Sequence, residues 1–211
     1  MSLHLRFFTA IDRLSSLDTP VLATTFGRDR SQLLQRGWIT DEGHLTHVMA
    51  PFLGSECEVE IEADPDAGCY RYRSPLDGRT VVQPLNEIAL CGIQIERWLT
   101  DLARMVGIED RRRASRPCLT PQHLWHLGDL RVAGTHDFAP VFVGRAWARA
   151  QAVNTSSVLA DPAWSRGGVI LQARQVQADL PRDHVIRALD EFVRLDDGQD
   201  VFDASAFDRV L

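Results

Sequence analysis

The sequence predicts a mixed α+β protein. Apolar residues repeat with helical period over 94–107, apolar and charged residues alternate over 56–63, and the second half interleaves strand-like with helix-like segments. We therefore expect an N-terminal helical part and an antiparallel three-stranded β-meander followed by a helix. A C-terminal α/β part with a β-hairpin and two terminal helices should complete the fold.

Length and composition limit the class of protein. The chain has 211 residues, of which 45% are hydrophobic and 25% charged, as is typical of one or two globular domains. No apolar run reaches the roughly 18 residues of a membrane helix. Arg6, Asp12 and Arg13 interrupt the N-terminal apolar stretch, so we expect no signal peptide there. We expect a cytoplasmic protein without a membrane partner.

Charge is distributed unevenly along the chain. All 23 basic residues are arginines, which favours a GC-rich bacterial genome. The alternative is a functional choice, because arginine binds carboxylates and phosphates better than lysine does. Residues 51–110 hold five arginines against twelve acidic residues, whereas residues 111–167 hold eight against three. Because the net charge is −6, nonspecific nucleic-acid binding could start only in the basic block.

The first fifty residues predict helices followed by a hairpin. Residues 3–17 carry one broad apolar stripe, 31–35 suit a short helix, and 38–40 and 45–49 suit two strands around a turn. The stretch LLQRGWITDEGHLTHV resembles the recognition helix and wing of small bacterial winged-helix regulators. This resemblance implies a nucleic-acid contact through Arg28 and Arg30, or a protein contact. The alternative is a helical cap with a hairpin.

Residues 56–83 predict the meander. In ECEVEIEA, four apolar residues alternate with four glutamates, so one strand face is apolar and the other carries carboxylates. Turns at 64–68 and 75–78 connect it to strands at 69–73 and 79–83. The carboxylates could bind a metal or a cationic partner, although a solvated face of a sheet is the commoner use of such a pattern.

The meander is similar to a zinc ribbon, but a ribbon needs two C-x-x-C knuckles to supply four zinc ligands. Only Cys57 and Cys69 occur here, so a zinc site is not expected. With Cys91 and Cys118 they are expected to be buried thiols and not a disulfide framework, and no cofactor is predicted.

The clearest helix spans 94–107, where Ile95, Trp98, Leu99, Leu102 and Val106 form one stripe. Gly107 should end it in the left-handed conformation. The basic joint at 109–117 should then separate an N-terminal domain, 1–108, from a C-terminal region, 118–211.

Arginines of the joint could bind phosphate or could simply solvate a linker. The candidates for nucleic-acid or phosphate binding are Arg111, Arg112, Arg113 and Arg116, in addition to Arg28 and Arg30.

The segment HLWHLGD and the following THD hold the only cluster of metal-ligand residue types. On a helix, His123 and His126 would share a face, as zinc ligands do. Asp129, His136 and Asp137 complete the candidate metal site. The alternative is a hairpin over 127–148, which would place His136 at an exposed tip.

Further along, residues 150–159 suit a helix and 168–173 a buried strand, which allows a parallel pair with the strand at 140–148. Residues 181–195 suit the first terminal helix, because Val185, Ile186, Leu189, Phe192 and Val193 follow a helical spacing. Asp203 or Ser205 should cap the last helix.

Known catalytic patterns are missing from the sequence. Neither G-x-S-x-G nor a phosphate-binding glycine loop occurs, and the chain has no lysine to activate water as restriction-type nucleases do. We expect a non-enzymatic binding or regulatory module with a protein partner first and nucleic acid second. The alternative is a metal-dependent hydrolase or nuclease that uses the histidine and aspartate cluster.

Overall fold

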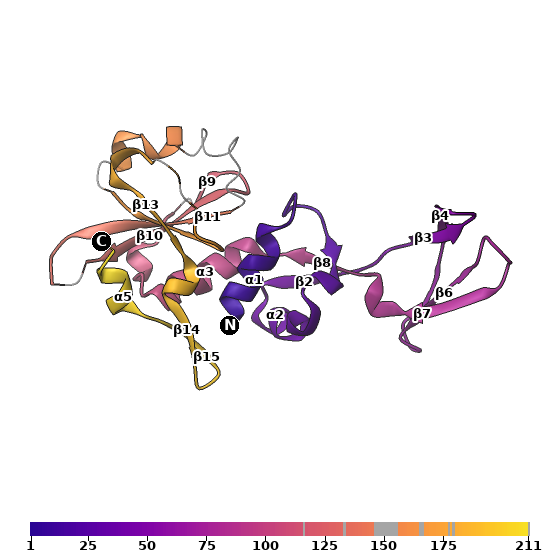
Figure 1. Ribbon diagram of the computed structural model, residues 1–211. Coiled ribbons are helices and arrows are strands. Elements are labelled where there is room, and N and C mark those ends of the chain that lie inside the picture. The colour runs from indigo at the N-terminus through magenta and orange to yellow at the C-terminus, as the bar shows by residue number, and fades with distance from the viewer. Residues whose placement is uncertain are drawn as a thin grey trace. The chain divides into compact units, whose positions relative to one another are not determined.

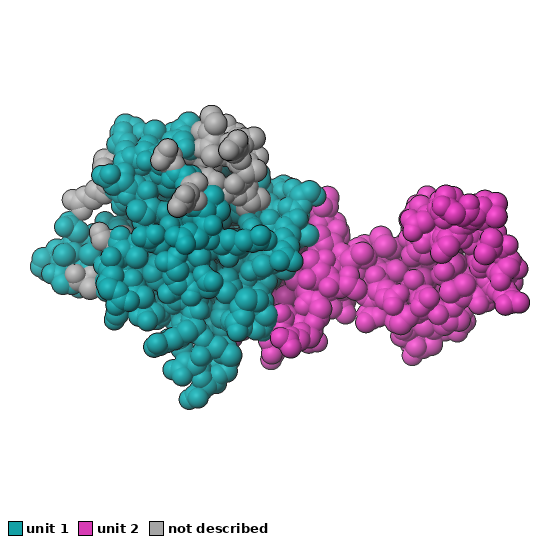
Figure 2. All heavy atoms as spheres, in the orientation of Figure 1, with its two compact units in different colours: residues 1–16, 95–211 teal, residues 17–94 magenta. Residues whose placement is uncertain are grey.

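The computed structural model describes residues 1–210 except 116, 133, 146–155, 165–166, 177 and 179. The chain forms two compact units (Figure 2). Unit 1 holds residues 1–16 and 95–211, and unit 2 holds residues 17–94. The joint at 109–117 lies within unit 1, and the division of the chain at that joint stays a prediction.

The mixed α+β class is confirmed, because five small sheets combine with short helices. Within the described ranges, no helix is both long enough and apolar enough to cross a membrane.

The main sheet of unit 1 has the order β13-β12-β11-β10-β9 (Figure 1). β10 is antiparallel to β9 and β11, which confirms the predicted hairpin, and β12 is parallel to β11, which confirms the predicted parallel pair. β13 continues in parallel with β12. The strands are β9 (Cys118–Thr120), β10 (Leu124–Arg131), β11 (Phe138–Gly144), β12 (Val169–Gln172) and β13 (Val185–Ala188).

Both faces of this sheet are covered at its centre, since β12 is buried at every position and β11 at all but its first. One core cluster consists of Leu124, Phe142, Leu159, Ile170 and Ile186. The predicted helix at 150–159 falls mostly outside the described residues, and residues 156–159 are helical.

The predicted helix over 181–195 is wrong. Val185 begins β13, a three-residue 3-10 helix follows at Leu189–Glu191, and the chain then enters β14 (Val193–Asp196). The reason is the buried strand β12, whose edge pairs with β13 from Val169 opposite Val185 onward. A strand, a tight turn and a second strand bury the same spaced apolar residues that suggested a helix.

Two side chains hold the ends of helix α1 (Leu3–Asp12), which is shorter than the predicted 3–17. The Asp200 carboxylate accepts hydrogen bonds from the backbone N–H groups of Leu3, at 3.1 Å, and His4, at 2.9 Å. At the other end, the Arg145 guanidinium donates to the carbonyl oxygens of Ile11 and Leu14. These bonds satisfy backbone groups that a helix leaves unpaired at its ends.

Arg145 is 1% exposed and also donates to the Gln122 carbonyl at 3.0 Å, so one buried cation joins α1 to the strands of the main sheet. Burial lowers the pKa of this guanidinium, and the Asp12 carboxylate opposes that shift. A buried charge of this kind is tolerated only because carbonyl oxygens surround it.

Helix α3 (Ile95–Val106) confirms the predicted amphipathic helix. Four residues of its predicted apolar stripe are buried: Trp98, Leu99, Leu102 and Val106. Gly107 has φ +90°, and the N–H of Ile108 donates to the Ala103 carbonyl, as in a Schellman cap.

The C-terminus of unit 1 folds around three phenylalanines. Phe192, Phe202 and Phe207 lie 5.1 to 6.1 Å apart between ring centroids. They come from the turn before β14, from β15 (Gln199–Phe202) and from α5 (Ala204–Asp208). The Asp203 carboxylate accepts from the Ala206 N–H at 3.0 Å, which confirms the predicted cap.

In unit 2, the strands β1 (Val21–Leu22), β8 (Ala89–Ile93) and β2 (Ile39–His44) form a sheet in the order β1-β8-β2. Helix α2 (Arg30–Arg36) precedes β2 and ends at Gly37, which has φ +69°. The predicted hairpin over 38–49 does not form, because β2 pairs with β8 instead of the next strand. β8 supplies buried apolar positions for this pairing.

Residues 45–88 therefore lie between two neighbouring strands, β2 and β8, and form two small sheets. The hairpin β3-β4 is one, and β5-β6-β7 is the other, which confirms an antiparallel meander. The predicted strand 56–63 is divided at Ile61. The bounds are β3 (His47–Phe52), β4 (Ser55–Glu60), β5 (Glu62–Asp64), β6 (Cys69–Arg73) and β7 (Thr80–Pro84).

The buried stripe of α3 generates a stability prediction. Leu102→Ala should lower the free energy of unfolding by about 2–5 kcal/mol, because the side chain is 0% exposed and its removal leaves a cavity. Urea denaturation followed by circular dichroism measures the change. Arg97→Ala on the exposed face should stay within about 0.5 kcal/mol, and equal losses in both variants would contradict a buried stripe.

Candidate functional site

Each unit contains a cavity that is lined by several charged side chains. The first, of 410 Å³, lies in unit 1 against the joint. It brings together residues that the sequence predicted for two separate sites. Its lining includes Arg111, Arg112, Arg113, His126, Asp129 and Trp164.

Each of the three arginines of this cavity already contacts a carboxylate or an aromatic ring. Arg111 Nε lies 2.6 Å from a Glu109 carboxylate oxygen, and Arg113 lies 2.6 Å from Asp110. The Arg112 guanidinium lies 3.3 Å from the centroid of the Phe138 ring. Hydrogen bonding to Arg111 and its charge lower the pKa of Glu109. The arginine triplet is therefore no free basic patch.

The joint is also packed and not an open linker. Residues 110–112 form a 3-10 helix, and Arg113 makes a β-bridge with Gly128. Gly128 has φ +137°, and a Cβ atom there would lie 2.4 Å from the Arg112 carbonyl oxygen. A glycine is required at this position, because any side chain would collide with the backbone of the joint.

His126 is buried beside the cavity, with its ring centroid 4.7 Å from that of Trp164 and 5.2 Å from that of Phe142. Its Nε2 atom lies 3.5 Å from an Asp129 oxygen, too far for a good hydrogen bond. Burial lowers the pKa of His126, and Asp129 opposes the shift. The imidazole is therefore neutral near pH 7 and has no positive charge with which to bind an anion.

The other candidate metal ligands lie apart from this pair. His123 Nδ1 lies 3.4 Å from the Arg145 carbonyl oxygen, and His136 and Asp137 are exposed in the turn between β10 and β11. Across the described parts of the chain, no group of three or more His, Cys, Asp or Glu side chains is placed to hold a metal ion.

The remaining arginine candidates lie elsewhere. Arg28 is exposed in a 3-10 helix at Gly27–Asp29 of unit 2. Arg30 lies 3.0 Å from the Asp41 carboxylate. Arg116 falls outside the described residues.

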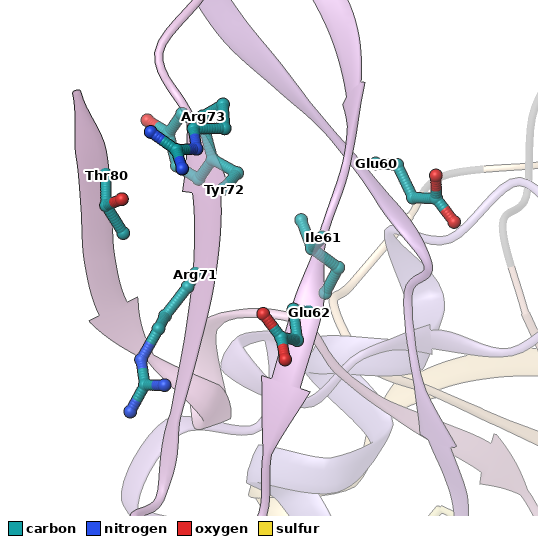
Figure 3. Close-up of a pocket in the computed structure, with 7 residues that line it drawn as sticks. All are labelled: Glu60, Ile61, Glu62, Arg71, Tyr72, Arg73 and Thr80. Atoms are coloured by element: carbon teal, nitrogen blue, oxygen red, sulfur yellow. The ribbon is translucent and has the colours of Figure 1, made fainter. Parts of the chain in front are cut away.

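The second cavity, of 630 Å³, lies in unit 2 where β4 separates from β6. Figure 3 shows the strand of Ile61 and Glu62 beside the strand that carries Arg71 to Arg73, with the Glu60 carboxylate directed away from these arginines. The lining consists of Glu60, Ile61, Glu62, Arg71, Tyr72, Arg73 and Thr80.

Two strand edges are open at this cavity. The pairing of β5 with β6 ends at Glu62 opposite Arg71. Beyond this pair, among the described residues, β4 has a strand partner on one side only, which is β3. Likewise, the end of β6 after Arg71 pairs with β7 alone. The Ile61 N–H donates to Thr46 beside β3, and the Ser74 N–H donates to Arg79 beside β7. Because backbone groups alternate along a strand, those of Glu56, Glu58, Glu60 and Arg73 face the open edges.

The hairpin β3-β4 also exposes apolar side chains. Met49, Phe52 and Leu53 are 56%, 37% and 78% exposed. Leu53 has φ +46°, a conformation that costs free energy for any residue with a branched side chain.

The open strand edges could not be predicted from the sequence. The alternation over 56–63 predicts one continuous strand, and nothing in it marks the change of partner at Ile61. The exposed glutamates were visible in the sequence, but their neighbourhood depends on pairings between residues distant in the chain.

Comparisons with protein-family models, with curated proteins and with solved structures find no match.

Buried histidines generate a prediction on pH dependence. His184 is 6% exposed, its Nδ1 accepts a hydrogen bond from the Gly168 N–H at 3.0 Å, and burial lowers its pKa. The unfolded chain therefore binds the proton more readily, so stability is fully present above the unfolded pKa of about 6.5 and falls as pH drops below it.

His184→Asn keeps an acceptor near Nδ1 but does not titrate. The free energy of unfolding of the wild type should fall as the pH drops from 7 to 5.5. In His184→Asn this fall should be smaller, by up to about 1.4 kcal/mol per pH unit. Urea denaturation at several pH values measures the slope. The exposed His136→Asn is the matched control, and an identical slope in wild type and His184→Asn would contradict the prediction.

Proposed function

We propose that the chain is a non-enzymatic binding module whose unit 2 receives an extended segment of another protein. One observation carries this proposal: two open strand edges face a cavity of 630 Å³ between β4 and β6. An extended peptide can add to such an edge through main-chain hydrogen bonds. A cavity of this size leaves room for its side chains.

The position of residues 45–88 in unit 2 supports this use. They leave the β1-β8-β2 sheet after His44 and return at Ala89, two residues that lie opposite each other. This order, with α2 before β2, is similar to the sheet of a winged helix, in which the wing connects the same two strands. Residues 45–88 would then be an enlarged wing that carries the binding surface.

Burial within 45–88 supports a role in binding as well. Ala50, Tyr70 and Ile88 are its buried hydrophobic residues, whereas the apolar side chains of Met49, Leu53, Leu76 and Val82 are more than half exposed. Residues 45–88 thus bury few apolar side chains of their own, which leaves apolar surface available to a partner.

Nucleic acid is the second candidate ligand, and the winged-helix strand order is the observation that favours it. Arg28 and Arg30 would provide the contacts, although Arg30 already pairs with Asp41. If this candidate holds, an electrophoretic shift with a 30-base-pair duplex should weaken at least about tenfold between 50 and 200 mM salt. Arg28→Ala should reduce the salt slope, and no shift at 50 mM salt would rule the candidate out.

The main proposal predicts that proline at the open edge blocks binding. In Glu58→Pro, the lost N–H is one that faces the edge and not β3, so the hairpin keeps its own bonds. A phage-displayed library of random 12-residue peptides is selected on the wild-type chain, and enriched peptides are measured by calorimetry. We expect the Kd to rise about tenfold or more in Glu58→Pro, because a backbone hydrogen bond is lost and the ring obstructs the edge.

Glu58→Ala is the matched control, because it removes the carboxylate but keeps the N–H. An enriched peptide should bind it within about threefold of wild type if main-chain pairing dominates. Failure to enrich any peptide, or equal affinity for wild type and Glu58→Pro, would refute edge addition.

A further inference from the structure

We infer that the segment bound at β4 carries arginine or lysine at every second position, with apolar residues between them. This inference rests on the proposed function and names the chemistry of its ligand. It follows from the distribution of side chains on the two faces of β4.

One face of the β3-β4 hairpin is acidic. Glu56, Glu58 and Glu60 are opposite Pro51, Met49 and His47 in the register, so all six side chains lie on the same face. These three glutamates are exposed. A strand added to the open edge of β4 places alternate side chains directly beside them, at the distance of a cross-strand pair.

Within the described residues, none of these three glutamates forms an ion pair, and the two arginines of the neighbouring strand β6 have other hydrogen-bond partners. Arg71 lies 3.1 Å from Asp64, and Arg73 donates to the Gly78 carbonyl at 3.2 Å. Negative charge along β4 is therefore available to a basic ligand.

The other face of the hairpin is apolar. Cys57 and Val59 are half-buried there, opposite Ala50, which is fully buried, and Val48. Residues of an added strand that point to this face extend a small apolar layer. The two faces together select a pattern of basic and apolar residues in alternation, which must span at least the six residues of β4.

A second copy of β4 is the occupant that the charges disfavour. In a pair of β4 strands, glutamates of one copy would lie opposite or diagonal to glutamates of the other, and like charges in such positions are destabilising. Acidic residues on an edge strand commonly prevent self-pairing. The same charges favour a basic strand, so the open edge of β4 disfavours a second copy of β4 and favours a cationic partner.

The test uses three synthetic peptides with blocked termini and the full chain. Ac-RVRVRVR-NH2 alternates, Ac-RRRRVVV-NH2 has the same composition in blocks, and Ac-EVEVEVE-NH2 reverses the charge. We expect the alternating peptide to bind at least about tenfold tighter than the block peptide at 150 mM salt, where nonspecific attraction between exposed charges is screened. The acidic peptide should not bind.

Variants locate the site. Glu58→Gln/Glu60→Gln should weaken the alternating peptide about tenfold, since two cross-strand charge pairs are lost. Asp66→Asn/Glu87→Gln changes the net charge equally at exposed positions outside β4 and should have little effect. Circular dichroism checks that each variant is folded.

Equal binding of the alternating and block peptides, or equal losses in both double variants, would overturn the inference. So would absence of binding together with dimerisation of Glu58→Gln/Glu60→Gln, since the glutamates would then serve only to prevent self-pairing. If library peptides without the basic pattern bind and are lost in Glu58→Pro, this inference fails while the proposed function stands.

Discussion

The pairing of β2 with β8 is the constraint on which unit 2 depends. Because β2 and β8 pair with each other, residues 45–88 are not part of the β1-β8-β2 sheet, and their strands pair with one another. The stretch from Ser55 to Asp64 then serves two partners in succession, β3 before Ile61 and β6 after it. One edge of this stretch pairs with β3 and the opposite edge pairs with β6, but neither pairing extends over the whole stretch, which leaves open backbone edges.

Elements set by local periodicity could be predicted from the sequence. Helix α3 needed only its own apolar stripe and Gly107, and β6 and β7 needed only alternation and two turns with proline or glycine. The cap at Asp203 was likewise a local feature. In each case the residues that decide the structure lie within a few positions of each other.

Elements decided by distant partners could not be predicted. Val185 and Ile186 fit a helix by spacing, but β12 offers a buried edge that makes them a strand. From the sequence, Arg113 could bind phosphate or solvate a linker, whereas the structure pairs it with Asp110 and packs its backbone on Gly128. His126 and Asp129 were expected near each other on chain distance alone, and their position beside the arginines depends on the fold of the joint.

His44 and Ala89 lie side by side, although all of β3 to β7 separates them in the chain. The entropic cost of closing such a loop grows only slowly with its length, and the pairing of β2 with β8 holds both of its ends. We therefore expect the three-stranded sheet to tolerate insertions and deletions in the turns between β3 and β7, where no strand of that sheet is interrupted.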